Sequence, residues 1–360
     1  MPPKKFKKRI TKSKAISKVT KETESNRDLT EHNWDFMIDT GSTLLNLNIS
    51  GGRSKTGGLP GGAFLEIYGP SSLGKTALAC AIGSAVSRMG GKVKYIDPEG
   101  RLDQQYAKAY GLLLSEDKGN YVMPNTVAEM FNEHIMKWDK WAGEESFTAI
   151  ICDGVSALTT DMEMEGNDKY GGKRAKDFSE GCRKSGRIIS GKNRLLIFTS
   201  QVREKMNAMM GDKETTSCGR ATEFYASVRI RIGKPAQGSK ITRTAKIGIK
   251  DKEIKKTIGI CSDAYIKKSS VDDPFRQCYL YLIFGYGLDD IRSNLTYNKT
   301  MMGEGNYVCG EKLKAGSLEK AIIKIEKANN EDWLRKRTIK IWNKAEDKLT
   351  MKRKPKVHAS

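Results

Sequence analysis

Residues 69–76, with the sequence GPSSLGKT, match the pattern GxxxxGK(S/T) of a phosphate-binding loop. Glycines in such a loop let successive backbone N–H groups point inward, and the helix that follows adds the positive end of its dipole. Lys75 is then expected to reach the outer phosphates of a nucleoside triphosphate, and the Thr76 hydroxyl to help hold Mg²⁺. The predicted phosphate contacts are Gly69, Pro70, Ser71, Ser72, Leu73, Gly74, Lys75 and Thr76.

Polar residues at the ends of three other apolar segments complete this chemistry. Asp153 ends the run 147–153 and is predicted to hold the water shell of Mg²⁺, although an Asp at a strand end could also start a turn. Glu99 follows the short run 93–97 and is the candidate to activate water, although Pro-Glu-Gly could be a plain surface turn. Gln201 follows the run 195–199, where an amide could sense the γ-phosphate by hydrogen bonding.

The elements that must position these residues alternate between strand and helix patterns. Apolar segments 63–68, 93–97, 147–153 and 195–199 read as buried strands, and segments 77–86 and 127–141 read as helices. A strand before and a helix after the phosphate loop argue against a chance match. The alternation predicts an α/β fold with a mostly parallel central sheet and helices on both faces. Segments 226–232, 241–268 and 277–284 look like further strands joined by hairpins.

Changes in composition divide the chain into four predicted parts. Residues 1–33 are predicted to be a basic N-terminal arm, and residues 34–288 the core that carries the phosphate loop. Residues 289–349 are expected to be a small C-terminal α/β domain with two amphipathic helices, the first capped by Ser317 with Lys320 in the third position. Residues 350–360 are a basic tail.

The charge balance favours a polyanionic partner. The 360 residues contain 64 Lys and Arg against 43 Asp and Glu, a net charge of +21, so nucleic acid is the leading candidate. A merely basic protein, or one that binds anionic surfaces without specificity, would have the same balance. The seven cysteines are scattered without a CxxC pair, and we find no secretory or membrane-spanning segment, which favours reduced thiols in a cytoplasmic protein without zinc.

Three segments together resemble the bacterial RecA recombinases. They are residues 57–76 around the phosphate loop, residues 95–106 with the sequence YIDPEGRLDQQY, and residues 211–229. The resemblance runs with gaps from about residue 40 to residue 287 and implies a RecA-like phosphate-loop ATPase core that uses ATP and Mg²⁺. It further implies that Glu99 activates water, that Asp103 and Tyr106 hold adenine, and that Gln201 senses the γ-phosphate.

The same resemblance implies two DNA-binding loops. Taken alone, residues 203–222 read as an ordinary mobile loop rich in Gly, Thr, Met and charge. By resemblance this segment orders on single-stranded DNA, with Met209 and Met210 wedging between bases. A first loop would span residues 162–175, with one face of the following helix meeting phosphates. The implied contacts are Lys176, Ser179, Arg183, Arg203, Lys205, Met209, Met210, Gly211, Lys213, Ser217, Gly219 and Arg220.

Several positions depart from the family pattern. Lys268 fits the first of two lysines that reach the ATP of a neighbouring subunit, but Ser270 stands at the second. Gly154 replaces the usual serine after Asp153, and the Lys-rich region 233–266 is longer than in the family. The C-terminal tail is basic where the bacterial proteins usually end acidic. These departures indicate a divergent, phage-type member.

The resulting hypothesis is an ATP-dependent recombinase in the cytoplasm of a bacterium or a phage-infected host. It would polymerise as a helical filament on single-stranded DNA, with residues 38–43 as interface material, and exchange strands with homologous duplex DNA. Two alternatives stay open at this point. One is a hexameric helicase-type motor on the same core, and the other is a DNA-binding filament regulator that does not hydrolyse ATP.

Overall fold

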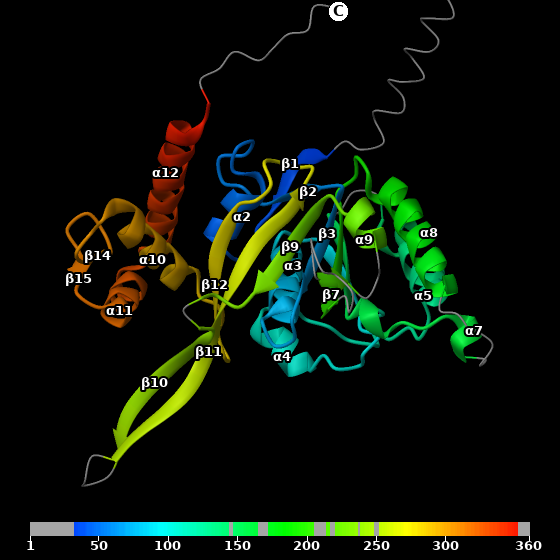
Figure 1. Cartoon of the computed structure of the whole chain (residues 1–360), viewed down its shortest axis with the longest axis horizontal. Helices are drawn as coiled ribbons and strands as arrows, with labels where there is room; N and C mark the ends of the chain where they lie inside the picture. The colour runs from blue at the N-terminus through cyan, green and yellow to red at the C-terminus, as the bar shows by residue number, and fades with distance from the viewer. Residues whose placement is uncertain are drawn as a thin grey trace, which may run out of the picture.

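The computed structural model describes residues 32–143, 147–164, 172–204, 214–216, 220–236, 238–247 and 252–351. Its centre is a sheet with the strand order β13-β12-β11-β9-β3-β7-β6-β4-β5 (Figure 1). Its parallel half consists of β3 (Ala63–Gly69), β4 (Lys92–Ile96), β5 (Tyr121–Val122), β6 (Thr148–Asp153), β7 (Arg194–Glu204) and β9 (Val228–Gly233). The remaining half is antiparallel and consists of β11 (Lys252–Ser269), β12 (Gln277–Ile283) and β13 (Gly287–Leu288). The predicted α/β fold with a mostly parallel central sheet is confirmed.

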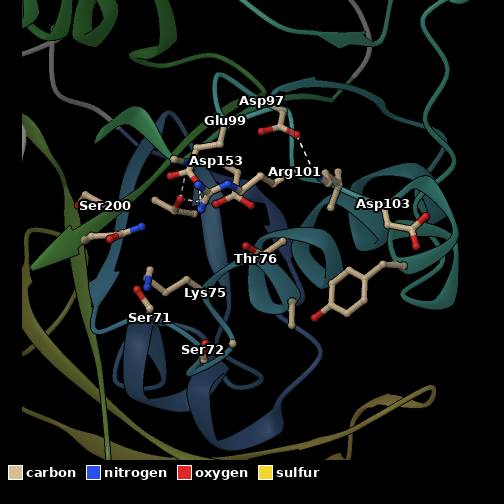
Figure 2. Close-up of a pocket in the computed structure, with 17 residues that line it drawn as sticks. Ser71, Ser72, Lys75, Thr76, Asp97, Glu99, Arg101, Asp103, Asp153 and Ser200 are labelled. Atoms are coloured by element: carbon tan, nitrogen blue, oxygen red, sulfur yellow. Dashed lines mark hydrogen bonds and ion pairs between the residues drawn. The ribbon is translucent and has the colours of Figure 1, made fainter. Parts of the chain in front are cut away.

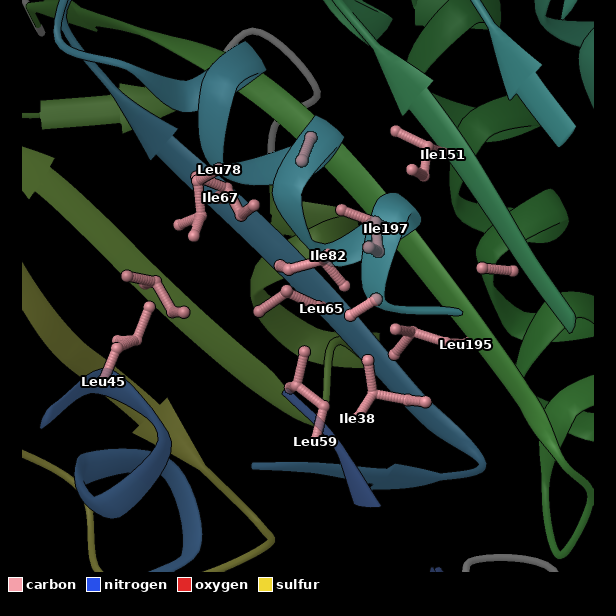
Figure 3. Packing of buried hydrophobic residues seen from close by; sticks show 14 of the residues in the cluster. Ile38, Leu45, Leu59, Leu65, Ile67, Leu78, Ile82, Ile151, Leu195 and Ile197 are labelled. Atoms are coloured by element: carbon pink, nitrogen blue, oxygen red, sulfur yellow. The ribbon is translucent and has the colours of Figure 1, made fainter. Parts of the chain in front are cut away.

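Alternate residues of the central strands point into two separate cores. Leu65, Ile151 and Ile197 pack against α3 (Lys75–Arg88), on the side seen in Figure 3. Their neighbours Phe64, Ile150 and Phe198 pack on the opposite face. Because both faces are covered, these strands carry nearly continuous apolar runs, as the sequence showed.

The second face is covered by several helices. They are α5 (Val127–Glu129), α6 (Trp138–Ala142), α8 (Gly172–Ile189) and α9 (Arg220–Tyr225). The predicted helix 127–141 is broken into pieces, because a π-helical turn, Met130–Ile135, replaces regular α-helix in its middle. Short helices α4 (Gln104–Ala109) and α7 (Asp161–Met164) follow the ends of β4 and β6.

The N-terminal described segment is tied into the body of the chain. Strand β1 (Asn33–Ile38) pairs with β2 (Leu59–Gly61), and α2 (Thr43–Ser50) lies between them in sequence. Thr40, Ser42 and Thr43 are almost fully buried. The backbone N–H and the hydroxyl of Thr43 both donate to Asp290, each at 2.7 Å. The expectation that residues 38–43 supply a subunit interface is therefore wrong for these three side chains, which are used within the chain.

The C-terminal region has a small core of its own. It contains α10 (Asp290–Met302), the two-stranded ribbon β14 (Tyr307–Val308) and β15 (Lys314–Ala315), α11 (Leu318–Ala328) and α12 (Glu331–Leu349). The Ser317 side chain caps α11 as predicted, accepting from the Lys320 N–H. Helix α10 is a third helix in this region, where the sequence predicted two. Two ion pairs join this region to the core, Arg335 to Asp39 at 2.8 Å and Arg276 to Glu346 at 2.9 Å.

Two further features bear on the earlier expectations. The six cysteines in the described part of the chain are buried and free, which fits reduced thiols. None of the helices in the described ranges is long and apolar enough to cross a membrane.

Strand β10 (Lys240–Ile247) pairs with the outer half of β11, and this hairpin projects away from the rest of the chain (Figure 1).

Candidate nucleotide site

A cavity of about 500 Å³ opens where β3, β4, β6 and β7 end. Ligands of open parallel sheets bind at this edge, outside the carboxyl ends of the strands. Figure 2 shows the lining side chains converging from four separate segments. The lining comprises Ser71, Ser72, Gly74, Lys75, Thr76, Ala77, Asp97, Glu99, Arg101, Leu102, Asp103, Tyr106, Asp153, Gly154, Thr199, Ser200 and Gln201.

The phosphate loop joins β3 to the first turn of α3. Gly74 has φ +91°, a backbone conformation that other residues rarely adopt, and a Cβ there would lie 2.0 Å from Leu282 Cδ1, so a side chain would be strained and would displace that leucine. Ser71, Ser72, Gly74, Lys75 and Thr76 face the cavity, whereas Gly69, Pro70 and Leu73 form the back of the loop and do not line it. The start of α3 therefore presents unpaired N–H groups toward the cavity, a geometry suited to anions.

The side chain of Lys75 is held by backbone carbonyl groups of the phosphate loop. Its Nζ donates to the carbonyl oxygens of Gly69 at 3.0 Å and Pro70 at 2.7 Å. Burial lowers the pKa of Lys75, and the nearby carboxylates of Asp153 and Glu99 partly oppose this shift. A bound phosphate would supply the negative charge that this partly buried ammonium lacks.

Asp153 is fixed by two hydroxyl groups. The Tyr95 hydroxyl donates to Oδ2 at 2.6 Å, and the Thr199 hydroxyl donates to Oδ1. Tyr95 and Thr199 come from the neighbouring strands β4 and β7, so the sheet itself aims the carboxylate. Sequence reasoning did not identify either hydroxyl, because only the strand order brings them to Asp153. The oxygen atoms of Thr76 and Asp153 are of the kind that Mg²⁺ prefers, and both line the cavity.

Glu99 lies across the cavity from the phosphate loop, on the segment after β4. Arg101 Nη1 lies 3.2 Å from its carboxylate, and this arginine, which the sequence reading had not singled out, is 80% exposed. The segment is fastened by Asp97, which accepts from the Tyr121 hydroxyl and the Leu102 N–H, each at 2.8 Å. The Glu99 carboxylate therefore lines the cavity with Arg101 as its ion-pair partner.

The glycine at position 154, where the family pattern has a serine, has a steric reason. This residue has φ +88°, and a Cβ there would lie 2.7 Å from both Cγ and Oε1 of Glu99. The Glu99 side chain therefore occupies the space that a serine would need. The position of the Glu99 side chain therefore depends on a glycine directly after Asp153.

Asp103, labelled in Figure 2, and Tyr106 both line the cavity. Asp103 caps α4, accepting from the Gln105 N–H at 2.8 Å. Tyr106 is 41% exposed and its ring lies 4.9 Å from that of Tyr110. An exposed aromatic ring beside a fixed carboxylate is suited to stacking and hydrogen bonding with a base.

Gln201 lines the cavity from β7, next to a buried charged cluster that the sequence reading missed. Glu66, in the middle of β3, is fully buried and accepts from Arg229 Nε at 2.5 Å and Ser200 Oγ at 2.7 Å. It also accepts from Thr222 Oγ1 at 2.6 Å, so it joins β7, β9 and α9. A charged residue within the apolar run 63–68 was the available signal, because a buried carboxylate requires partners.

The other predicted residues that the structure describes do not line this cavity. Lys268 donates to the carbonyl oxygens of Glu223 at 2.9 Å and Phe224 at 2.7 Å. Ser270 donates its N–H to Ser227 at 2.8 Å. Lys176 and Arg183 are exposed on α8, and Ser179 is half-buried there. Outside the described residues lie Lys205, Met209, Met210, Gly211, Lys213, Ser217 and Gly219, together with the side chains of Arg203 and Arg220.

Comparisons with known proteins agree with this geometry. The family described as the RecA N-terminal domain matches residues 11–289. Protein RecA of Thermus thermophilus is 34% identical over 71% of this chain and 69% of its own length. Protein RecA of Deinococcus radiodurans is 35% identical over 71% of this chain and 64% of its own, and that of Symbiobacterium thermophilum is 31% identical over 83% and 78%. From the extent of these matches, we conclude that the chain belongs to the RecA family.

Proposed function

We propose that this protein is a DNA-dependent ATPase that polymerises on single-stranded DNA and promotes homologous pairing and strand exchange. The observation that carries the proposal is the convergence of Lys75, Asp153 and Glu99 on one cavity. Family membership supports the coarser part of it, a nucleotide-hydrolysing recombinase. The intact acid and lysine set speaks against a regulator that does not hydrolyse ATP.

In this mechanism Lys75 leaves the carbonyl oxygens of Gly69 and Pro70 to contact the outer phosphates of ATP. Mg²⁺, when bound, would neutralise phosphate charge beside Thr76 and Asp153. Tyr95 and Thr199 keep Asp153 aimed at that position. Glu99 accepts a proton from the attacking water, and Asp103 and Tyr106 hold the base.

Coupling to DNA would run through β7. This strand passes the cavity at Ser200 and Gln201 and continues to Glu204, the second residue of the predicted loop 203–222. We propose that Gln201 senses the γ-phosphate and that the Glu66 cluster links this strand to α9 on the far side of the loop. Lys268, held at the end of α9, would face the ATP of the neighbouring subunit.

We propose that DNA binds the two predicted loops and helix α8. We also propose that the chain divides into the four parts 1–33, 34–288, 289–349 and 350–360.

A helicase-type motor is not favoured, because the matched family and the relatives named above are RecA proteins.

The deciding experiment measures ATP hydrolysis with and without single-stranded DNA for the wild type and for Glu99→Gln. Single strands should stimulate the wild type strongly, and the variant should bind ATP but lose turnover. Glu311→Gln, at an exposed position of the C-terminal region, is the matched control and should behave as wild type. Turnover that ignores DNA, or that survives in Glu99→Gln, would contradict the proposal.

A further inference from the structure

The outer part of the β10–β11 hairpin pairs with no other strand in the described part of the chain. Residues 240–247 pair with β11, and residues 252–257 pair with β10 alone. We call residues 240–247 and 252–257 the basic ribbon. At about 3.3 Å per residue, the part formed by residues 242–247 and 252–257 extends roughly 20 Å from the sheet. Figure 1 shows it standing clear of the rest of the molecule.

An isolated two-stranded ribbon is only marginally stable in water, so its length requires a reason. Every residue from Thr242 to Ile247 and from Lys252 to Lys256 is exposed. Among them Ile247 and Ile254 are 59% and 44% exposed. The ribbon buries almost nothing within this chain and therefore contributes little to the core.

The pairing register separates the charges of the ribbon by face. Residues directly opposite in an antiparallel pair share a face, so one face carries the pairs Arg243 with Lys256, Ala245 with Ile254 and Ile247 with Lys252. This three-cation face holds no carboxylate. The opposite face carries Lys240 and the pairs Thr242 with Thr257, Thr244 with Lys255 and Lys246 with Glu253, so its three cations stand beside a carboxylate and threonines.

Arg243 and Lys256 stand directly opposite each other, an arrangement that destabilises a strand pair. A polyanion on this face would turn that repulsion into attraction. A second copy of the ribbon would add like charges and is disfavoured for that reason. Lysines also protect exposed strand edges from aggregation, but edge protection does not require cations and exposed isoleucines to gather on the same face.

The dimensions fit one polyanion in particular. The major groove of B-DNA is about 12 Å wide and admits a two-stranded ribbon. Lys252 lies four residues along the ribbon from the level of Arg243 and Lys256, roughly 13 Å away. Cations at this separation can meet phosphates on both walls of the groove, with the apolar side chains between them.

We propose that the three-cation face of the basic ribbon binds double-stranded DNA in its major groove. The proposal rests on the proposed function, in which duplex DNA is the second substrate, and it assigns to that substrate a site distinct from the two loops. Its three cations are Arg243, Lys252 and Lys256.

The test measures binding of the full-length protein to a short fluorescein-labelled duplex by anisotropy, between about 50 and 200 mM salt. The test variant is Arg243→Gln/Lys252→Gln/Lys256→Gln. Its matched control, Lys240→Gln/Lys246→Gln/Lys255→Gln, removes the same charge from the opposite face of the same hairpin. A third variant replaces residues 242–257 by Asn-Gly, which closes a short hairpin.

Loss of three phosphate contacts should reduce the slope of log affinity against log salt by about 2.7 and weaken binding at least tenfold near 0.1 M salt. The shortened hairpin should reproduce this loss, and the opposite-face control should keep most of the affinity. Equal losses in the two triple variants, or none in either, would overturn the proposal. An equal loss with labelled poly-L-glutamate would also overturn it, in favour of an acidic polypeptide.

A second assay measures how strongly single-stranded DNA stimulates ATP hydrolysis. It distinguishes failure of the ribbon proposal from failure of the proposed function. The three-cation variant should retain that stimulation, which also reports that the chain is folded. If the wild type shows no stimulation, the proposed function fails. If stimulation is present but the ribbon variants bind duplex as the wild type does, only the ribbon proposal fails.

Discussion

Replacement of Gly154 by alanine should impair hydrolysis through Glu99. The new Cβ would lie 2.7 Å from Glu99 Cγ, whereas ordinary contact begins at 3.4 Å, so the carboxylate must move by at least about 0.7 Å. A misplacement near 1 Å at a reacting group can cost about 100-fold in rate. We therefore expect kcat to fall roughly 10- to 100-fold. The positive φ of this residue adds about 1–2 kcal/mol of destabilisation.

The assay compares kcat for ATP, the affinity for a fluorescent ADP analogue, and unfolding in urea. Gly191→Ala is the control, because Gly191 has φ +66° and a Cβ there meets nothing within 4 Å. It should lose similar stability and keep full turnover. Nucleotide affinity should change little in Gly154→Ala, because the Glu99 carboxylate is assigned to water and not to the phosphates.

A double-variant cycle tests the assigned cause. In a Glu99→Gln background the Gly154→Ala change should add almost no further loss of turnover, because the displaced group is already inactive. Wild-type kcat in Gly154→Ala would refute the coupling between these positions. An additional large loss in the double variant would show that the glycine acts through another residue.

Three other variants test separate parts of the structure. Lys75→Ala should abolish ATP turnover, and retained turnover in a folded variant would contradict the site assignment. Arg229→Met leaves the buried Glu66 uncompensated and should cost about 3–5 kcal/mol in urea unfolding, with partial recovery on adding Glu66→Gln. Burial would raise the pKa of Asp39, but the charge of Arg335 holds this pKa below its ordinary value. The ionised Asp39 carboxylate therefore stabilises the folded chain above about pH 4, and this contribution is lost as the pH falls further. Because this pair is partly exposed, Asp39→Asn should cost at most about 1 kcal/mol at pH 7, a difference that shrinks in acid. A difference independent of pH would contradict that reading.

The elements near the phosphate loop were predictable because their signals are local. A buried parallel strand reads as a continuous apolar run, and the glycines at 69 and 74 occupy backbone conformations that side chains rarely adopt. The cap at Ser317 follows from a hydrogen bond to a residue three positions on. Helix α10 was not foreseen, because contacts with α2, β12 and α12 stabilise a segment with a weak helical pattern. The π turn at Met130–Ile135 was not foreseen either.

Sequence alone determined the class of chemistry, because eight contiguous residues form the phosphate loop and their spacing needs no distant partner. Only the tertiary structure decided how the acids are aimed. Tyr95 meets Asp153 across 58 positions, and Arg229 meets Glu66 across 163, in each case because neighbouring strands of the sheet are distant in sequence. The three-cation face of the basic ribbon has the same origin, since strand register and not composition places Arg243 opposite Lys256.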